Sequence, residues 1–206
     1  MHKRIAAIVL TGGAAALTVG LTATSAVAAT WTVKPGGAIT AKSGTTTLTD
    51  KNTGNKLTCA SSKAGATLKS GKGLSGTGIG SIKTISFSNC TGPLGLTFTV
   101  TPGHLPWKLN AVSFSSGVTH GTITGIHATL KGSGCSAVVD GTGGTANNGK
   151  VTVTYTNSTH KLKVLTTGGN LHIYKVSGCL GLINSGDPST FSAAYTITPG
   201  QTVTSP

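Results

Sequence analysis

The stretch KVTVTYTN, residues 150–157, decides the fold class of this chain. Val151, Val153 and Tyr155 alternate in it with threonines. Successive side chains of a β-strand point to opposite faces, so the apolar residues would enter a core while the threonines face water. β-branched and aromatic residues are also the types enriched in strands. The stretch therefore predicts a half-buried β-strand.

Similar alternation recurs along the chain, and turn residues separate the alternating segments at short intervals. Residues 51–54, Lys-Asn-Thr-Gly, have the composition of a hairpin turn. No segment after residue 29 shows a helical period. Many short strands at this spacing predict an all-β protein, an antiparallel β-sandwich or barrel. The predicted strands are Thr45–Asp50, Asn55–Cys59, Ile82–Ser88, Leu96–Thr101, Ala111–Ser115, Thr122–Leu130, Lys161–Thr166 and Phe191–Thr198.

Two parts of the chain repeat one pattern. CTGPLG at 90–95 leads into TFTVTPG at 97–103, and CLGL at 179–182 leads into AYTITPG at 194–200. Each unit has a cysteine, a glycine turn, an alternating strand and Thr-Pro-Gly. The repeat predicts duplicated halves, roughly 30–110 and 111–206, either as one pseudo-symmetric body or as two small tandem domains. No proline- or serine-rich linker separates the halves, which favours a single domain over residues 30–206.

The first 29 residues have the layout of a secretory signal peptide. His-Lys-Arg at 2–4 is followed by an apolar run from residue 5 to about 27, and SAVAA at 25–29 offers small residues for cleavage. The alternative is an uncleaved membrane anchor. No later apolar run is long enough to span a membrane. The sequence therefore predicts a cleavable signal peptide over 1–29 and a soluble, secreted, extracellular product.

Four cysteines in an exported chain predict two disulfides. Three pairings are possible, and the internal repeat selects Cys59–Cys90 and Cys135–Cys179. A zinc site is the competing interpretation, but no two cysteines have the close spacing of a zinc knuckle. We predict no metal site and no cofactor.

The chain has few charged residues, and most of them are basic. Charged residues make up 9% of the chain, against about 25% in ordinary domains. Removing Lys3 and Arg4 from the formal net charge of +13 leaves +11, carried by lysines alone. This imbalance favours association with an anionic cell-wall polymer or glycan. Nucleic acid is disfavoured, because the lysines are scattered and no arginine remains for bidentate contacts.

The sequence contains few residues or motifs suited to catalysis. Its acidic residues are Asp50, Asp140 and Asp187, each at a turn where it would serve its own backbone. No Gly-x-Ser-x-Gly elbow is present, so a Ser-His-Asp site would have to be assembled from distant strands. No two of the later histidines have the spacing of a metal site on one strand or helix. These histidines are His104, His120, His127, His160 and His172.

One loop is a candidate ligand site. His104, Trp107 and Lys108 lie in HLPWK, residues 104–108, which follows a predicted strand. An exposed indole with a lysine beside it could stack on a sugar ring or hold a planar ligand. The alternative is that Trp107 plugs one end of a core that has few other aromatic residues.

Three segments of the C-terminal half carry a resemblance. They are GSGCSA at 132–137, VTVTYTN at 151–157 and VSGCLGLIN at 176–184. In these the chain resembles a group of uncharacterised exported proteins from actinobacteria, which implies secretion and a β-rich fold and carries over no catalytic residue. A weaker, purely architectural likeness is to the enediyne-binding apoproteins, with which the chain shares no motif.

Together these features favour a secreted, non-enzymatic protein that acts as a binding or structural module at the cell surface or outside the cell. Two alternatives stay open. One is a secreted hydrolase with a Ser/His/Asp site. The other is a carrier of a small apolar ligand, which predicts an apolar-lined cavity inside the fold.

Overall fold

The computed structural model describes residues 30–144 and 147–206, so the predicted signal peptide lies outside the described residues. These residues form fifteen strands and one 3-10 turn, η1 (Pro93–Gly95). The first eight strands are β1 (Thr30–Lys34), β2 (Gly37–Ser43), β3 (Thr46–Asp50), β4 (Lys56–Leu68), β5 (Gly71–Ser75), β6 (Gly80–Thr91), β7 (Thr97–Gly103) and β8 (Trp107–Ser115). The others are β9 (Val118–Gly132), β10 (Cys135–Asp140), β11 (Gly149–Thr156), β12 (Lys161–Leu165), β13 (His172–Ser177), β14 (Ser189–Thr198) and β15 (Thr202–Thr204).

The main sheet closes on itself. Its strands pair in the order β11-β12-β14-β2-β4-β6, then β8 joins β6 to β9, and β9 pairs back to β11. Every pairing is antiparallel. The all-β antiparallel prediction is confirmed, and the closed sheet is the arrangement found. Within the described part of the chain, no helix is long and apolar enough to cross a membrane.

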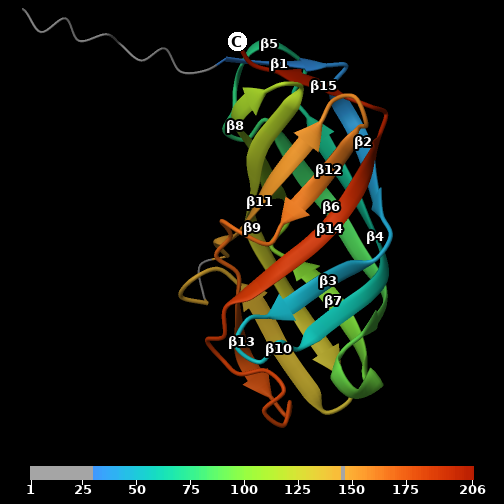
Figure 1. The fold of residues 1–206 in the computed structure, drawn as a ribbon, viewed down its shortest axis with the longest axis vertical. Helices are drawn as coiled ribbons and strands as arrows, with labels where there is room; N and C mark the ends of the chain where they lie inside the picture. The colour runs from blue at the N-terminus through green and yellow to red at the C-terminus, as the bar shows by residue number, and fades with distance from the viewer. Residues whose placement is uncertain (1–29, 145–146) are drawn as a thin grey trace, which may run out of the picture.

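The molecule is elongated, and its longest strands pair with different neighbours in the upper and lower parts of the sheet (Figure 1). At the lower level β3 lies between β14 and β4, and β7 pairs with β6 and β9, followed by β10 and β13. Backbone hydrogen bonds then join β13 to the segment before β14. The amide of Ile173 donates to the Asp187 carbonyl at 2.8 Å, and that of Ser189 to the Leu171 carbonyl at 2.7 Å. These bonds close the lower level as well.

A small sheet covers the upper end. β1 pairs with both β15 and β5, and Figure 1 shows these three strands lying across the end of the main sheet. Trp31 and Val33 of β1 are buried. The Gln201 side chain is buried beside them and accepts a hydrogen bond from the Gly36 amide at 2.8 Å. The interior is therefore capped at this end by packed side chains.

Both sequence halves contribute to one sheet and one core. β14 of the second half pairs with β2 of the first half, and β9 pairs with β7 of the first half. The predicted disulfides are confirmed: Cys59 bonds to Cys90 and Cys135 to Cys179. Cys59 and Cys90 are directly opposite each other in the β4–β6 ladder. Cys59–Cys90 joins β4 to β6, and Cys135–Cys179 ties the loop that follows β13 to β10.

Candidate functional site

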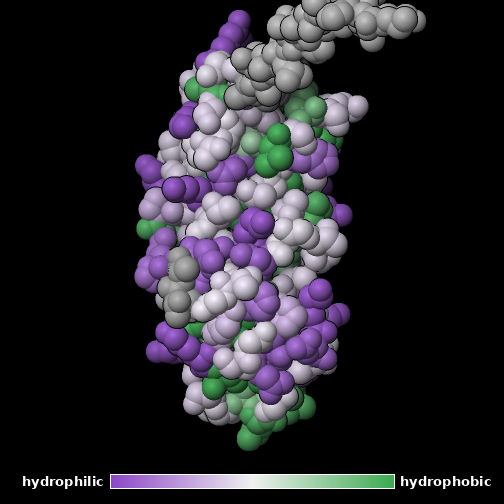
Figure 2. Space-filling model, turned by 90° about the vertical axis from the view of Figure 1, so that its left-hand side faces the viewer, coloured by the Kyte–Doolittle hydropathy of each residue, from purple (hydrophilic) through white to green (hydrophobic). Residues whose placement is uncertain are grey.

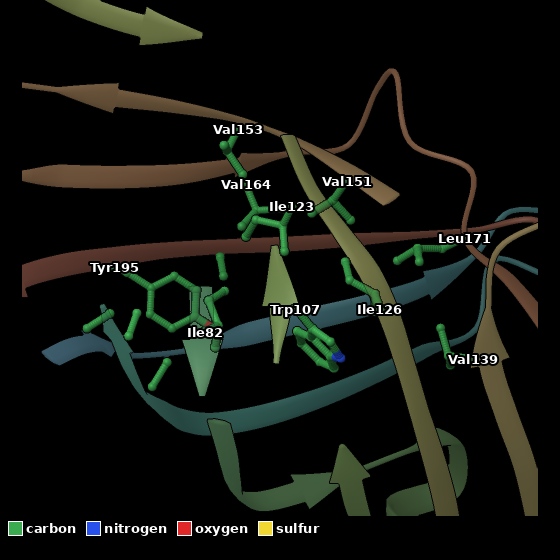
Figure 3. Packing of buried hydrophobic residues seen from close by; sticks show 14 of the residues in the cluster. Ile82, Trp107, Ile123, Ile126, Val139, Val151, Val153, Val164, Leu171 and Tyr195 are labelled. Carbon is green, nitrogen blue, oxygen red and sulfur yellow. The ribbon is translucent and has the colours of Figure 1, made fainter. Parts of the chain in front are cut away.

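The closed sheet surrounds an apolar cavity of about 120 Å³. Strand alternation creates it, because each strand of the sheet turns one face of apolar side chains inward. Figure 3 shows these side chains projecting toward one another from strands on different sides of the interior. Among the labelled residues of the wall are Ile82, Trp107, Ile123, Val151, Val164 and Tyr195.

Small side chains leave this space unfilled. Ala41, Ala64, Ala66 and Ala128 all contribute to the wall. Protein interiors are normally packed with few voids larger than a water molecule. At roughly 24 cal/mol per Å³, a cavity of this volume costs about 3 kcal/mol of stability. A cost of that size makes the cavity a candidate for function.

Two smaller voids extend the cavity along the long axis. One of about 70 Å³ lies toward the upper cap and shares Ile39 and Leu162 with the cavity wall. Another of about 30 Å³ lies toward the lower end and shares Leu57 and Leu130. The interior could therefore accept an elongated guest after small side-chain movements.

A crevice on the side of the molecule reaches the cavity wall from outside. It has a volume of about 260 Å³ and lies between the 165–172 segment and the start of β14. Val151, Leu171 and Phe191 belong both to its wall and to the cavity wall. Phe191 also packs edge-on against Phe87, with ring centroids 5.9 Å apart. These side chains form the boundary that an entering ligand would have to cross.

The cavity wall offers one uncommitted polar group. Thr46 is buried, and its Oγ1 has no hydrogen-bond partner within the described protein. The Tyr195 hydroxyl donates to Ser62 Oγ at 2.9 Å, and Trp107 Nε1 donates to the Gly103 carbonyl at 3.0 Å. Burial raises the pKa of Tyr195 to about 12, which keeps the phenol neutral. The Thr46 hydroxyl is thus the group free to bind a polar atom of a guest.

The three residues of the predicted ligand loop do not lie together: one faces the cavity and two face the solvent. Trp107 is only 5% exposed and lies in the cavity wall. The exposed indole required for stacking on a sugar is therefore not found, because β8 turns this side chain inward. The alternative interpretation, a tryptophan that fills the core, describes its position. His104 and Lys108 are exposed to solvent and do not reach the cavity wall.

A histidine–aspartate pair lies on the outer face of β9 and β10. His127 Nδ1 is 3.0 Å from Asp140 Oδ2, and the His104 ring packs edge-on against His127 with a centroid distance of 4.7 Å. Asp140 is fully buried, and its Oδ1 accepts hydrogen bonds from the amides of Gly141 and Asn148. Burial opposes ionisation of Asp140, but the bonds from His127 and the two amides outweigh it and lower the pKa.

This pair supplies two members of a Ser/His/Asp site. Across residues 30–144 and 147–206, no serine hydroxyl hydrogen-bonds to His127. Sequence inspection did not single out the pair, because thirteen positions separate its members and only the β9–β10 pairing brings them together. Asp140 instead fastens the loop that follows β10, in keeping with the turn role inferred for it.

The other two aspartates form a buried pair at the lower end. Asp50 Oδ1 accepts hydrogen bonds from the amides of Asn52 and Thr53, while Asp187 accepts from the Asn52 and Asn184 side chains. Burial raises the pKa of Asp50, and the adjacent Asp187 carboxylate adds to the rise. Burial also opposes ionisation of Asp187, but hydrogen bonds led by Asn52 outweigh it, so its pKa is lowered. A proton on Asp50 therefore lets the two carboxyls hydrogen-bond to each other.

We expect Asp50→Asn to raise the free energy of unfolding at pH 7 by about 1 kcal/mol, because a neutral amide replaces a buried charge beside Asp187. In the wild type the contribution of Asp50 is complete below its unfolded pKa and is lost as pH rises through its higher folded pKa. Urea denaturation at several pH values measures this. The gain should vanish below the unfolded pKa of Asp50, where the wild type is also neutral; a variant less stable than the wild type at neutral pH contradicts the assignment.

No group of three histidine, cysteine, aspartate or glutamate side chains suited to a metal ion occurs among the described residues. Comparison with models of protein families, with curated proteins and with solved structures finds no match for this chain. Functional assignment therefore rests on the geometry of the cavity and of the molecular surface.

Proposed function

We propose that this protein is an exported carrier that holds a small, largely apolar ligand inside its closed sheet. The supporting observation is the cavity of about 120 Å³ with its almost entirely apolar wall. An engineered apolar cavity of about 150 Å³ binds benzene, so guests of about six carbon atoms match this volume. The hydrophobic effect favours their transfer from water into such a site.

The ligand we infer carries one hydrogen-bonding group. A buried hydroxyl without a partner is costly, and a guest that bonds to Thr46 Oγ1 removes that cost. Small apolar sites typically combine a hydrophobic wall with a few polar groups that orient the ligand. The preferred class is therefore a short aliphatic or aromatic compound with a single hydroxyl or carbonyl.

Export is the second component of the proposal. The signal peptide predicted over residues 1–29 would direct the chain out of the cytoplasm. The two disulfides are of the kind that persists in oxidising compartments. A carrier with this location would capture its ligand outside the cell, as a specific form of the non-enzymatic binding module that the sequence favours.

Binding of 1-hexanol and of n-hexane tests the proposal. The full coding sequence should be expressed in an exporting bacterial host, with the N-terminus of the purified protein determined by mass spectrometry. We expect both compounds to change the tryptophan fluorescence saturably, because Trp107 lies in the cavity wall, and to raise the melting temperature. A folded protein that responds to neither compound overturns the proposal.

Thr46→Val separates the polar contact from the cavity itself. Valine has nearly the same shape as threonine and lacks the hydroxyl, so affinity for n-hexane should be kept. Affinity for 1-hexanol should fall by about 3- to 10-fold, the usual net value of one neutral hydrogen bond. Equal losses for both compounds would show that Thr46 does not orient the ligand.

A further inference from the structure

Two leucines project from the lower end of the molecule. Leu94 in η1 is 84% exposed, and Leu180 in the loop after β13 is 93% exposed. Figure 2 shows hydrophobic residues gathered at this end, away from the β1–β5–β15 cap. We call this end, formed by residues 92–96 and 178–186, the apolar tip.

Both leucines have backbone conformations that leucine disfavours. Their φ angles are 58° at Leu94 and 51° at Leu180. A bulky side chain with positive φ is uncommon, whereas asparagine or glycine adopts this conformation readily. Folding alone would favour a smaller or polar residue at both positions. Strained, exposed apolar residues in two related loops are therefore candidates for a functional contact.

The two loops are held firmly and close together. Cys59–Cys90 lies at the base of the first loop and Cys135–Cys179 at the base of the second. Gly92 and Pro93 of the first loop line the same small void as Ile183 of the second. Asn55 Nδ2 donates to the Leu182 carbonyl at 2.6 Å, which ties the second loop to the β3–β4 turn. The two disulfides and this hydrogen bond therefore hold the loops of the apolar tip in place.

The surface charge around the tip has one sign. Asp50, Asp140 and Asp187 are all buried, so no side-chain carboxylate is exposed, and the sequence contains no glutamate. None of the described lysines is buried. Three that lie on strands leading to the tip are exposed: Lys56, Lys131 and Lys175. An anionic partner would meet no like charge here.

We propose that the apolar tip docks on an anionic lipid surface, with Leu94 and Leu180 inserted among the acyl chains and the lysines at the headgroups. Apolar side chains combined with cationic residues are the general requirements for binding at a lipid interface. A protein partner fits less well, because a stable interface needs about 800 Å² on each side and the tip presents two projecting side chains. The proposal does not depend on the cavity, so either can fail alone.

Co-sedimentation with vesicles tests the docking. The purified exported protein should bind vesicles of phosphatidylglycerol and phosphatidylcholine, and bind pure phosphatidylcholine at least 10-fold more weakly. Leu94→Asn with Leu180→Asn should weaken binding to the anionic vesicles by about 100-fold, since two apolar insertions are lost. Asparagine suits positive φ, so this double variant should melt at or above the wild-type temperature.

Val112→Thr is the matched control, because Val112 is also exposed, at 64%, but lies on β8 away from the tip. Its vesicle binding should equal that of the wild type. Binding that survives the double leucine substitution, or that is equal for neutral vesicles, overturns the proposal. Retention on an anionic wall polymer or polyphosphate resin, unchanged in the leucine variant and with no vesicle binding, would assign the basic surface to a polymer instead.

Discussion

Substitution of all four cysteines by alanine is expected to leave the chain unfolded at room temperature. The disulfides close loops of 31 and 44 residues, for which the chain-entropy model gives each bond about 3–4 kcal/mol. Domains are typically stable by only about 5–15 kcal/mol in total, and the cavity already lowers that figure here. Loss of both bonds would therefore remove most or all of the margin. Circular dichroism and the urea midpoint measure the result.

The paired variants separate the two bonds. Cys59→Ala with Cys90→Ala, and Cys135→Ala with Cys179→Ala, should each fold with a lowered urea midpoint. Ser61 and Ser88 face each other in the same β4–β6 ladder, so Ser61→Ala with Ser88→Ala is the matched control and should change little. A four-alanine variant with the wild-type midpoint would show that burial alone stabilises the closed sheet.

The sequence predicted β11, whose burial alternates, and missed β5, whose burial does not. Residues 150–157 coincide with β11, Gly149–Thr156, in which every second residue is buried. β5, Gly71–Ser75, reads GKGLS and has no buried residue. It forms only because β1 offers it hydrogen-bond partners at the upper cap. The formation of β5 thus depends on pairing with β1, which is distant in the sequence.

The candidate sites were less accessible to sequence reasoning than the fold. The sequence placed Trp107 in a loop after a predicted strand, whereas it begins β8, and only closure of the sheet between β9 and β11 decides that its side chain faces an enclosed cavity. The same limit applies to the apolar tip. The repeat located both cysteine turns, yet the exposure of Leu94 and Leu180 depends on how neighbouring loops pack around them.

Filling the cavity is expected to change stability and ligand binding in opposite directions. Ala66 of β4 and Ala128 of β9 line the cavity wall. Replacing both by leucine adds methyl groups to space that no side chain fills in the wild type. Because the cavity lowers stability, filling part of it should raise the free energy of unfolding by about 1–2 kcal/mol. A guest of the cavity's size would then clash with the wall, so 1-hexanol and n-hexane should bind about 100-fold more weakly.

Ala60→Leu provides the matched control, because Ala60 lies on the same strand, β4, with its side chain exposed. This variant should bind both compounds like the wild type. A filled variant that is more stable and no longer binds would assign the ligand to the interior, since damage to the fold would lower stability and binding together. If the filled variant gains stability and still binds with full affinity, the guest occupies another surface, and the cavity is a packing defect that the disulfides allow the protein to tolerate.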